Sequence, residues 1–281
     1  MRLASEGGVG RWERQAFRWF RLRKRIHQYL RYRPGCEKHV VFIFGCQRSG
    51  TSLLSHLFRL DWDTITYDEM SPLSTSDPEG FRLNPLPEVR ARIAADRAPL
   101  VVCKPLVESQ NAIRILDAVP GSRAIWMFRD YRGVVRSNLR FFGPDNGRRD
   151  LAPILGGSGT DWRSEGLEAA DSAAARSLLG EGASGEDAAA LFWYFRNILA
   201  FRQGLDRDER VQFCDYDRLV TDPKGTMAQL YRGIGRPYPG DRIVADVAEF
   251  RPGAKNPPSF APAIADRCDG LLARLKAVPG S

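Results

Sequence analysis

A short apolar run that ends in a glycine-rich turn is the feature that most restricts the fold of this chain. Residues 40–44 read Val-Val-Phe-Ile-Phe, and a helical apolar pattern begins a few residues later. A continuous apolar run of this length predicts a strand that is buried on both faces, which is typical of a parallel sheet covered by helices. The turn between the run and the helix is Gly45-Cys46-Gln47-Arg48-Ser49-Gly50-Thr51-Ser52.

The same alternation of strand-like runs and helical patterns continues to residue 234. Strands are predicted at residues 100–103, 124–128 and 211–214, and helices at 112–118, 134–141, 188–201 and 226–234. Strands that alternate with helices at this spacing build a parallel sheet. The predicted fold class is therefore α/β, with a parallel sheet flanked by helices.

We divide the chain into an N-terminal appendage, residues 1–38, and an α/β domain, residues 39–281. The appendage holds eleven of the 42 Lys and Arg but only three of the 34 Asp and Glu, so it accounts for the whole net charge of +8. Residues 151–190 are rich in Gly, Ala and Ser, and we expect them to form a flexible insertion, either a lid or a surface loop.

Within the appendage, residues 11–33 predict a basic amphipathic helix that ends at Pro34-Gly35. The helix either docks on an anionic membrane or an acidic partner, or packs its apolar stripe on its own domain and leaves its arginines in water. The second arrangement is the favoured one. The apolar positions at helical spacing are Trp12, Ala16, Trp19, Ile26 and Leu30.

Composition excludes several other classes of protein. Outside the appendage the charges balance, so no basic stripe for nucleic acid is indicated. The five cysteines are scattered and odd in number, which argues against a disulfide framework or a zinc site and fits a reducing, cytoplasmic compartment. The chain has three histidines, and we expect no metal site.

The turn at residues 45–52 has the chemistry of an anion cradle. Unpaired N–H groups at a helix N-terminus carry partial positive charge, and glycines let them close around a phosphate. Nucleoside-triphosphate loops end in G-K-[ST], but this chain has Thr51 in the lysine position and its cation, Arg48, inside the turn. This replacement indicates a different anion.

The turn resembles the 5′-phosphosulfate loop of sulfotransferases, which use 3′-phosphoadenosine-5′-phosphosulfate (PAPS) and release adenosine 3′,5′-bisphosphate (PAP). The resemblance implies a P-loop-type α/β fold, with a parallel sheet flanked by helices. The tyrosylprotein and related bacterial sulfotransferases are the most similar branch. The family often has Pro where this chain has Gln47. The resemblance implies that the donor is cradled by Gly45, Cys46, Gln47, Arg48, Ser49, Gly50, Thr51 and Ser52.

Two further stretches support the resemblance. Residues 128–137 are similar to the family's R-D-P-R-D-x-x-x-S element, which implies that Arg129 and Ser137 hold the nucleotide 3′-phosphate. Residues 215–223 resemble its Y-E-D-L-V-x-D-P run, which implies that Tyr216 lies near the adenine or is a buried structural tyrosine.

Sulfuryl transfer needs cations near the leaving phosphate and a base near the acceptor. We expect Arg48 and Lys104 to supply the charge, since Lys104 ends a predicted strand and matches a strand-end lysine of the similar branch. Glu69 is the expected base, because the chain returns to the sheet edge there and the tyrosylprotein enzymes have their proposed base in a similar place. Other possible bases are Asp68, Glu108 and His56.

The expected function is transfer of the PAPS sulfuryl group to a hydroxyl acceptor, which can be a small molecule, a saccharide, a lipid or a peptide tyrosine. An alternative is a nucleoside-triphosphate-dependent kinase or switch, with Asp130 or Asp215 holding magnesium. A third possibility is a non-catalytic scaffold that docks through residues 11–33.

Overall fold

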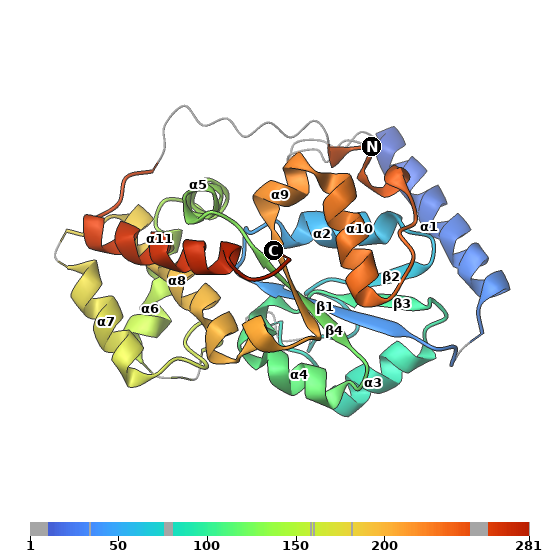
Figure 1. The fold of residues 1–281 in the computed structure, drawn as a ribbon, viewed down its shortest axis with the longest axis horizontal. Coiled ribbons are helices and arrows are strands. Elements are labelled where there is room, and N and C mark those ends of the chain that lie inside the picture. Colours follow the sequence, from blue (N-terminus) through green and yellow to red (C-terminus); the bar gives the residue numbers. More distant parts are fainter. Residues whose placement is uncertain are drawn as a thin grey trace.

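Five parallel strands form the centre of the molecule in the computed structural model (Figure 1). The structure describes residues 11–33, 35–75, 81–157, 159, 161–180, 182–247 and 258–280; of residues 11–17 it describes the backbone alone. The strand order is β2-β3-β1-β4-β5, and every neighbouring pair is parallel, so the predicted α/β class is confirmed. The strands are β1 His39–Gly45, β2 Thr64–Tyr67, β3 Leu100–Cys103, β4 Arg123–Phe128 and β5 Val211–Asp215.

Helices cover both faces of this sheet. The described helices are α1 Arg11–Arg31, α2 Thr51–Leu60, α3 Leu86–Ala95, α4 Ala112–Ala118, α5 Tyr131–Phe142, α6 Asn146–Gly156, α7 Ala169–Leu179, α8 Gly185–Arg202, α9 Tyr216–Thr221, α10 Pro223–Ile234 and α11 Pro262–Lys276. Three short 3₁₀ segments join them: η1 Leu106–Asn111, η2 Leu205–Arg207 and η3 Asp241–Val244.

The central strand β1 explains the continuous apolar run. Val41 and Ile43 point into one core, which includes side chains of α2 and α10, while Phe42 and Phe44 point into the other, which includes side chains of α4 and α8. Successive side chains of a strand point to opposite faces, and here each face is covered by helices. Every position of the strand interior is therefore buried and apolar.

Strand β2, Thr64–Tyr67, lies at one edge of the sheet and was not predicted from the sequence. Four residues are too few for a clear alternation of apolar and polar positions. The composition Thr-Ile-Thr-Tyr, which is all β-branched or aromatic, was the available signal. The strand matters for function, because Asp68 and Glu69 follow it directly.

The segment 151–190, which we expected to be a flexible insertion or a surface loop, is largely helical in the structure. It contains the end of α6, all of α7 and the start of α8, and its Leu151, Ile154 and Ala175 are fully buried. The expectation of a surface loop is therefore wrong for the described residues. Small residues such as alanine allow α6 to pack closely on α7 and α8. The segment is therefore packed although it contains few large apolar residues, the feature on which the expectation of a loop depended.

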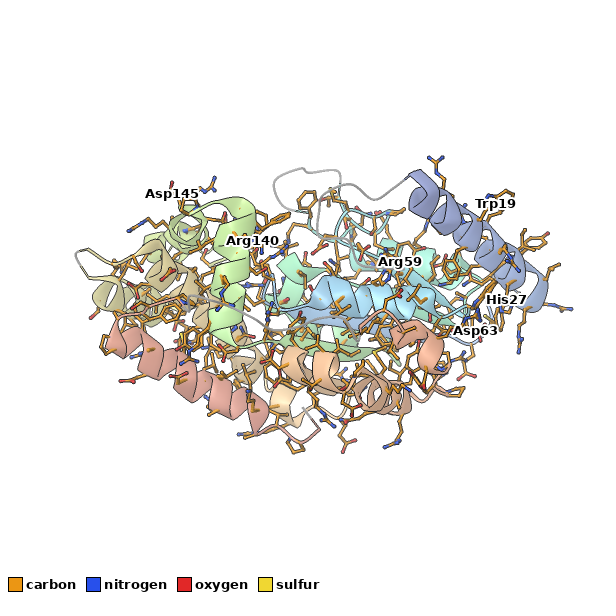
Figure 2. The ribbon with its side chains drawn as sticks, turned by 90° about the horizontal axis from the view of Figure 1, so that it is seen from above. Trp19, His27, Arg59, Asp63, Arg140 and Asp145 are labelled. Atoms are coloured by element: carbon orange, nitrogen blue, oxygen red, sulfur yellow. The ribbon has the colours of Figure 1, made fainter. Side chains whose placement is uncertain are left out.

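Helix α1 lies at one end of the molecule, beyond α2 (Figures 1 and 2). It contacts the body through polar side chains and through Phe20, whose ring centroid lies 5.6 Å from that of Trp62. Lys24 donates to the carbonyl of Arg59, and Gln28 donates to the carbonyls of Trp62 and Thr64 at 2.9 and 3.1 Å. Trp19, Ile26 and Leu30 are exposed, so the favoured expectation that the apolar stripe packs on the domain is wrong for the described residues; Trp12 and Ala16 lie outside the described side chains.

Candidate functional site

The glycine-rich turn leads from the carboxyl end of β1 into α2. Gly50 caps α2 in the left-handed conformation with φ 94° and, as a glycine, has no side chain that could accept from the first turn of the helix. The first backbone N–H groups of a helix have no intrahelical partner and carry partial positive charge. Arg48 also has a positive φ, 65°, so the turn holds a non-glycine residue in a strained conformation. A turn with this backbone, at the start of a helix, is suited to hold an anion.

Close packing against the neighbouring strands requires glycine at both ends of the turn. A Cβ atom on Gly45 would lie 2.2 Å from the carbonyl oxygen of Met127 in β4. A Cβ atom on Gly50 would lie 2.2 Å from Cδ2 of Tyr216, which begins α9 after β5. Tyr216 is 6% exposed, and its ring lies directly against the turn.

Arg129 lies on the ring of Tyr216, with its guanidinium carbon 4.1 Å from the ring centroid. Gly133 provides the room for this side chain, because a Cβ atom there would lie 2.8 Å from Nε of Arg129. The structure thus brings three sequence-predicted residues, Gly50, Tyr216 and Arg129, into one continuous contact at the ends of β1, β4 and β5.

The side chain of Arg48 reaches helix α5. Its Nε donates a hydrogen bond to Oγ of Ser137 at 3.0 Å, and its guanidinium carbon lies 4.4 Å from the centroid of Phe141. The turn and the element that carries Arg129 and Ser137 are therefore directly connected. The described contacts place Arg48 beside Ser137, a residue implied in 3′-phosphate binding.

Gln47 and Cys46 fix the inner part of the turn. Gln47 donates through its side-chain amide to Asp150 of α6, a buried carboxylate that also accepts from Asn146 at 2.7 Å and from Arg163 at 3.2 Å. Cys46 is fully buried, and burial raises the pKa of its thiol to about 12, which excludes a thiolate nucleophile near neutral pH. Asp150 was not predicted, since nothing in the local sequence marks it as a partner of the turn.

Lys104 and Glu69 form an ion pair beside the turn. Nζ of Lys104 lies 2.7 Å from Oε2 of Glu69 and donates to Oγ of Ser52 at 3.2 Å. Lys104 is only 5% exposed and Glu69 is 28% exposed. The structure therefore brings the expected cation, the expected base and the start of α2 together.

Asp68, an alternative base, is held by other partners. Its carboxylate accepts from Ser55 at 2.9 Å and pairs with Arg59, both on α2, while Lys104 lies 3.9 Å away. Both oxygens of this carboxylate therefore have a donor on α2, which holds the side chain along the edge of the sheet.

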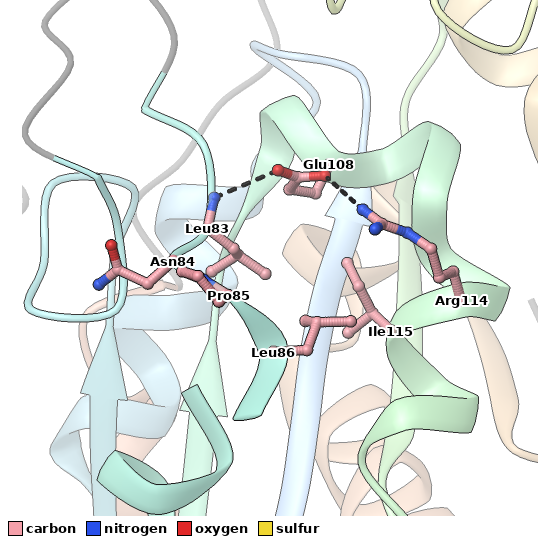
Figure 3. Close-up of a pocket in the computed structure, with 7 residues that line it drawn as sticks. All are labelled: Leu83, Asn84, Pro85, Leu86, Glu108, Arg114 and Ile115. Atoms are coloured by element: carbon pink, nitrogen blue, oxygen red, sulfur yellow. Dashed lines mark hydrogen bonds and ion pairs between the residues drawn. The ribbon is translucent and has the colours of Figure 1, made fainter. Parts of the chain in front are cut away.

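Glu108, another alternative base, is a buried structural carboxylate. Its Oε1 accepts from Nε of Arg82 at 2.7 Å and from the backbone N–H of Leu83 at 3.2 Å, and its Oε2 accepts from Asn111 at 2.9 Å. Figure 3 shows Glu108 between Leu83 and Arg114 at the rim of a small pocket. These donors occupy both oxygens, so Glu108 is poorly suited to take a proton.

His56, the fourth possible base, lies on the helix α2 that follows the turn. Its Nε2 is buried without a hydrogen-bond partner among the described residues, and burial lowers the pKa of its imidazole. Within the described residues there is also no group of three or more His, Cys, Asp and Glu side chains that could hold a metal ion.

Comparison with known proteins gives matches only at the level of solved structures. No family model matches the chain, and no curated protein matches it. A sulfotransferase from Alicyclobacillus acidocaldarius aligns with a TM-score of 0.49 and 14% identity over 87% of this chain and 95% of that one. A sulfotransferase from Mycobacterium tuberculosis aligns with a TM-score of 0.46 and 15% identity over 95% and 88% of the two chains.

The sulfotransferase domain of an olefin synthase from Synechococcus PCC 7002 is also similar, with a TM-score of 0.42 and 15% identity over 85% of this chain and 91% of that one. All three structures are described as sulfotransferases or sulfotransferase domains, the family that the sequence motifs resemble.

Proposed function

We propose that this protein is a sulfotransferase that moves the sulfuryl group of PAPS to a hydroxyl acceptor. The observation that carries the proposal is the contact between the two elements that we expect to bind anions. Arg48 with Ser137 makes one part of this contact, and Gly50, Tyr216 and Arg129 make the other. One turn suits a 5′-phosphosulfate and the other element suits a 3′-phosphate. A nucleotide with phosphate groups on both the 5′ and the 3′ positions of its ribose fits this pair of sites. A nucleoside triphosphate has phosphates on the 5′ position alone and would leave the second site without a phosphate.

In this proposal Glu69 is the base. It accepts the acceptor's hydroxyl proton while the acceptor oxygen forms a bond to sulfur and the bond between sulfur and the bridging phosphate oxygen breaks. The products are the sulfate ester, PAP and a protonated Glu69, which returns its proton to water. Lys104 neutralises the charge that develops on the bridging oxygen, together with the N–H groups of the turn.

The ion pair between Lys104 and Glu69 suits both roles. At 2.7 Å the two groups are in direct contact, so an acceptor hydroxyl that reaches the carboxylate also lies near the ammonium group. When Glu69 takes the proton, its attraction for Lys104 weakens, and the ammonium group is then free to stabilise the leaving phosphate. The positive charge of Lys104 would thus stabilise the bridging oxygen while negative charge develops on it.

The alternative of a magnesium-dependent kinase or switch has less support. Asp130 accepts from the backbone N–H of Arg132 at 2.8 Å, and Asp215 accepts from that of Asp217 at 2.9 Å. Both carboxylates therefore cap the helices that follow their strands, α5 and α9. A magnesium ion would compete with these caps.

Calorimetric titration of the protein with PAP tests the proposal directly. We expect binding in the micromolar range without added metal, and weaker binding of ATP with magnesium. Absence of PAP binding at millimolar concentration would overturn the proposal. A screen of phenols, saccharides, lipids and tyrosine peptides with sulfur-labelled PAPS then identifies the acceptor.

A further inference from the structure

Helix α1 presents its apolar side to solvent. Trp19 is 65% exposed, Leu22 48%, Ile26 50% and Leu30 79%. At about 100° per residue these four side chains fall within an arc of about 80° on one side of the helix. Figure 2 shows Trp19 on the outer side of α1, whereas His27 and Asp63 lie between the helix and the body. We call Trp19, Leu22, Ile26 and Leu30 the outer stripe.

The orientation of α1 is fixed by its inner side. Lys24 and Gln28 are both 8% exposed and donate to carbonyl groups at the end of α2 and on the edge strand β2. His27 contacts Asp63 at 3.1 Å. Burying these polar groups without their partners is unfavourable, so rotation of the outer stripe into the body would cost several hydrogen bonds. The exposure of the stripe is therefore a property of the docked helix.

Exposed arginines flank the outer stripe. Arg18 and Arg25 lie along one of its borders and Arg23 along the other, and all three side chains are exposed. A helix that combines an apolar stripe containing tryptophan with arginines at its borders lies in the plane of a lipid surface, where the apolar residues enter the acyl boundary and the arginines meet anionic headgroups.

We propose that α1 docks this protein on the surface of an anionic lipid bilayer through the outer stripe. Charge selects this occupant over a second copy of the chain, because a symmetric contact through the stripe would bring the flanking arginines of both copies together. No described helix is both long enough and apolar enough to span a membrane, so the proposed contact is a surface contact.

Co-sedimentation of the full chain with lipid vesicles tests this proposal. The probes are vesicles of phosphatidylcholine alone and vesicles of phosphatidylcholine with phosphatidylserine. We expect binding to the second kind that weakens strongly when the salt concentration is raised, because salt screens the arginines. Ile26→Glu with Leu30→Glu, and separately Arg18→Glu with Arg25→Glu, should each lower the partition coefficient at least about tenfold.

Arg207→Glu is the matched control, because Arg207 is 90% exposed and lies on η2, outside α1; it should retain most of the vesicle binding. Circular dichroism checks that each variant is folded, which is expected since the substituted side chains are exposed. The proposal is overturned if the wild-type protein does not bind anionic vesicles at low salt, or if Ile26→Glu with Leu30→Glu binds them as the wild type does. Self-association in sedimentation velocity that the same double variant abolishes would assign the stripe to a second copy instead.

Discussion

The ammonium group of Lys104 and the carboxylate of Glu69 form an ion pair of 2.7 Å at the carboxyl ends of two neighbouring strands, β3 and β2. The parallel register sets this contact. Tyr67 pairs with Cys103, so the residues that follow them leave the sheet side by side. The pair lies next to the start of α2, where the proposed donor binds.

Glu69→Gln should leave PAP affinity nearly unchanged and lower the turnover of PAPS by about 100-fold or more, the usual contribution of a general base. Glutamine keeps the size of the side chain and loses its basicity. Calorimetry with PAP and a sulfuryl-transfer assay separate the two effects. Retention of full activity would show that Glu69 is not the base, and Asp68 would be the next candidate. Glu108 is less suitable, because donors occupy both of its oxygens; Glu108→Gln should mainly lower the melting temperature.

Arg129→Ala should weaken PAP binding by about 10- to 100-fold, which corresponds to loss of one charge-assisted hydrogen bond. Arg48→Ala should also weaken binding, and in addition release Ser137 and Phe141 from their contacts. Arg207→Ala, at a position 90% exposed, is the control for loss of one positive charge. Equal affinities of the Arg129→Ala variant and the control would show that Arg129 has no part in nucleotide binding.

Gly50→Ala should disrupt the turn, because its Cβ atom would lie 2.2 Å from the ring of Tyr216 and the backbone has a positive φ. Gly121→Ala is the matched control: its φ is also positive, 77°, but no atom lies near the added methyl group. The control should lose about 1–2 kcal/mol of unfolding free energy from backbone strain alone. Gly50→Ala should lose more and bind PAP poorly, as urea unfolding and calorimetry will measure; equal losses would mean that Tyr216 moves freely.

Gln47→Ala should lower PAP affinity several-fold with only a small change in melting temperature, since Asp150 keeps Asn146 and Arg163 as donors. The physical reason is loss of order in the turn, which must then be restored when the nucleotide binds. Gln229→Ala, a glutamine on the surface of α10, is the control. An unchanged affinity of the Gln47 variant would show that the bond to Asp150 does not order the cradle.

Stability should rise with pH between about 7 and 9 through Lys24. Burial lowers the pKa of its ammonium group from 10.5 to about 7, despite the opposing field of Asp61. In this interval the unfolded chain binds more protons than the folded one at Lys24, so raising the pH favours folding by at most about 1.4 kcal/mol per pH unit. Urea unfolding of the wild type and of Lys24→Met at about pH 7 and about pH 9 checks this. An equal change of the unfolding free energy with pH in the two proteins would contradict the prediction.

The sheet and the glycine-rich turn could be predicted from the sequence because their signals are local. The run at residues 40–44, the glycines that follow it and the strand-helix alternation lie within short windows, and each reports burial or backbone conformation directly. Glu69 and Lys104 were also indicated by the sequence, as base and cation, but their ion pair was not predicted. Strand β2 was not predicted, because a four-residue edge strand shows no period that distinguishes it from a loop.

The orientation of α1 was predicted wrongly for a different reason. An amphipathic pattern shows that a helix has two unlike sides, but it does not show which one faces the domain. That choice depends on unpaired carbonyl groups at the end of α2 and along the edge strand β2, which Lys24 and Gln28 satisfy.

The sequence by itself determined the parallel sheet and the glycine-rich turn that follows β1, because backbone conformation and burial are encoded in adjacent positions. Only the tertiary structure decided that Glu69 pairs with Lys104, that Arg48 reaches Ser137, that Gln47 reaches Asp150 and that the apolar side of α1 faces outward. Each of these depends on hydrogen bonds and charges between segments that are distant in the chain, and their pairing is fixed only when the sheet brings the strand ends together.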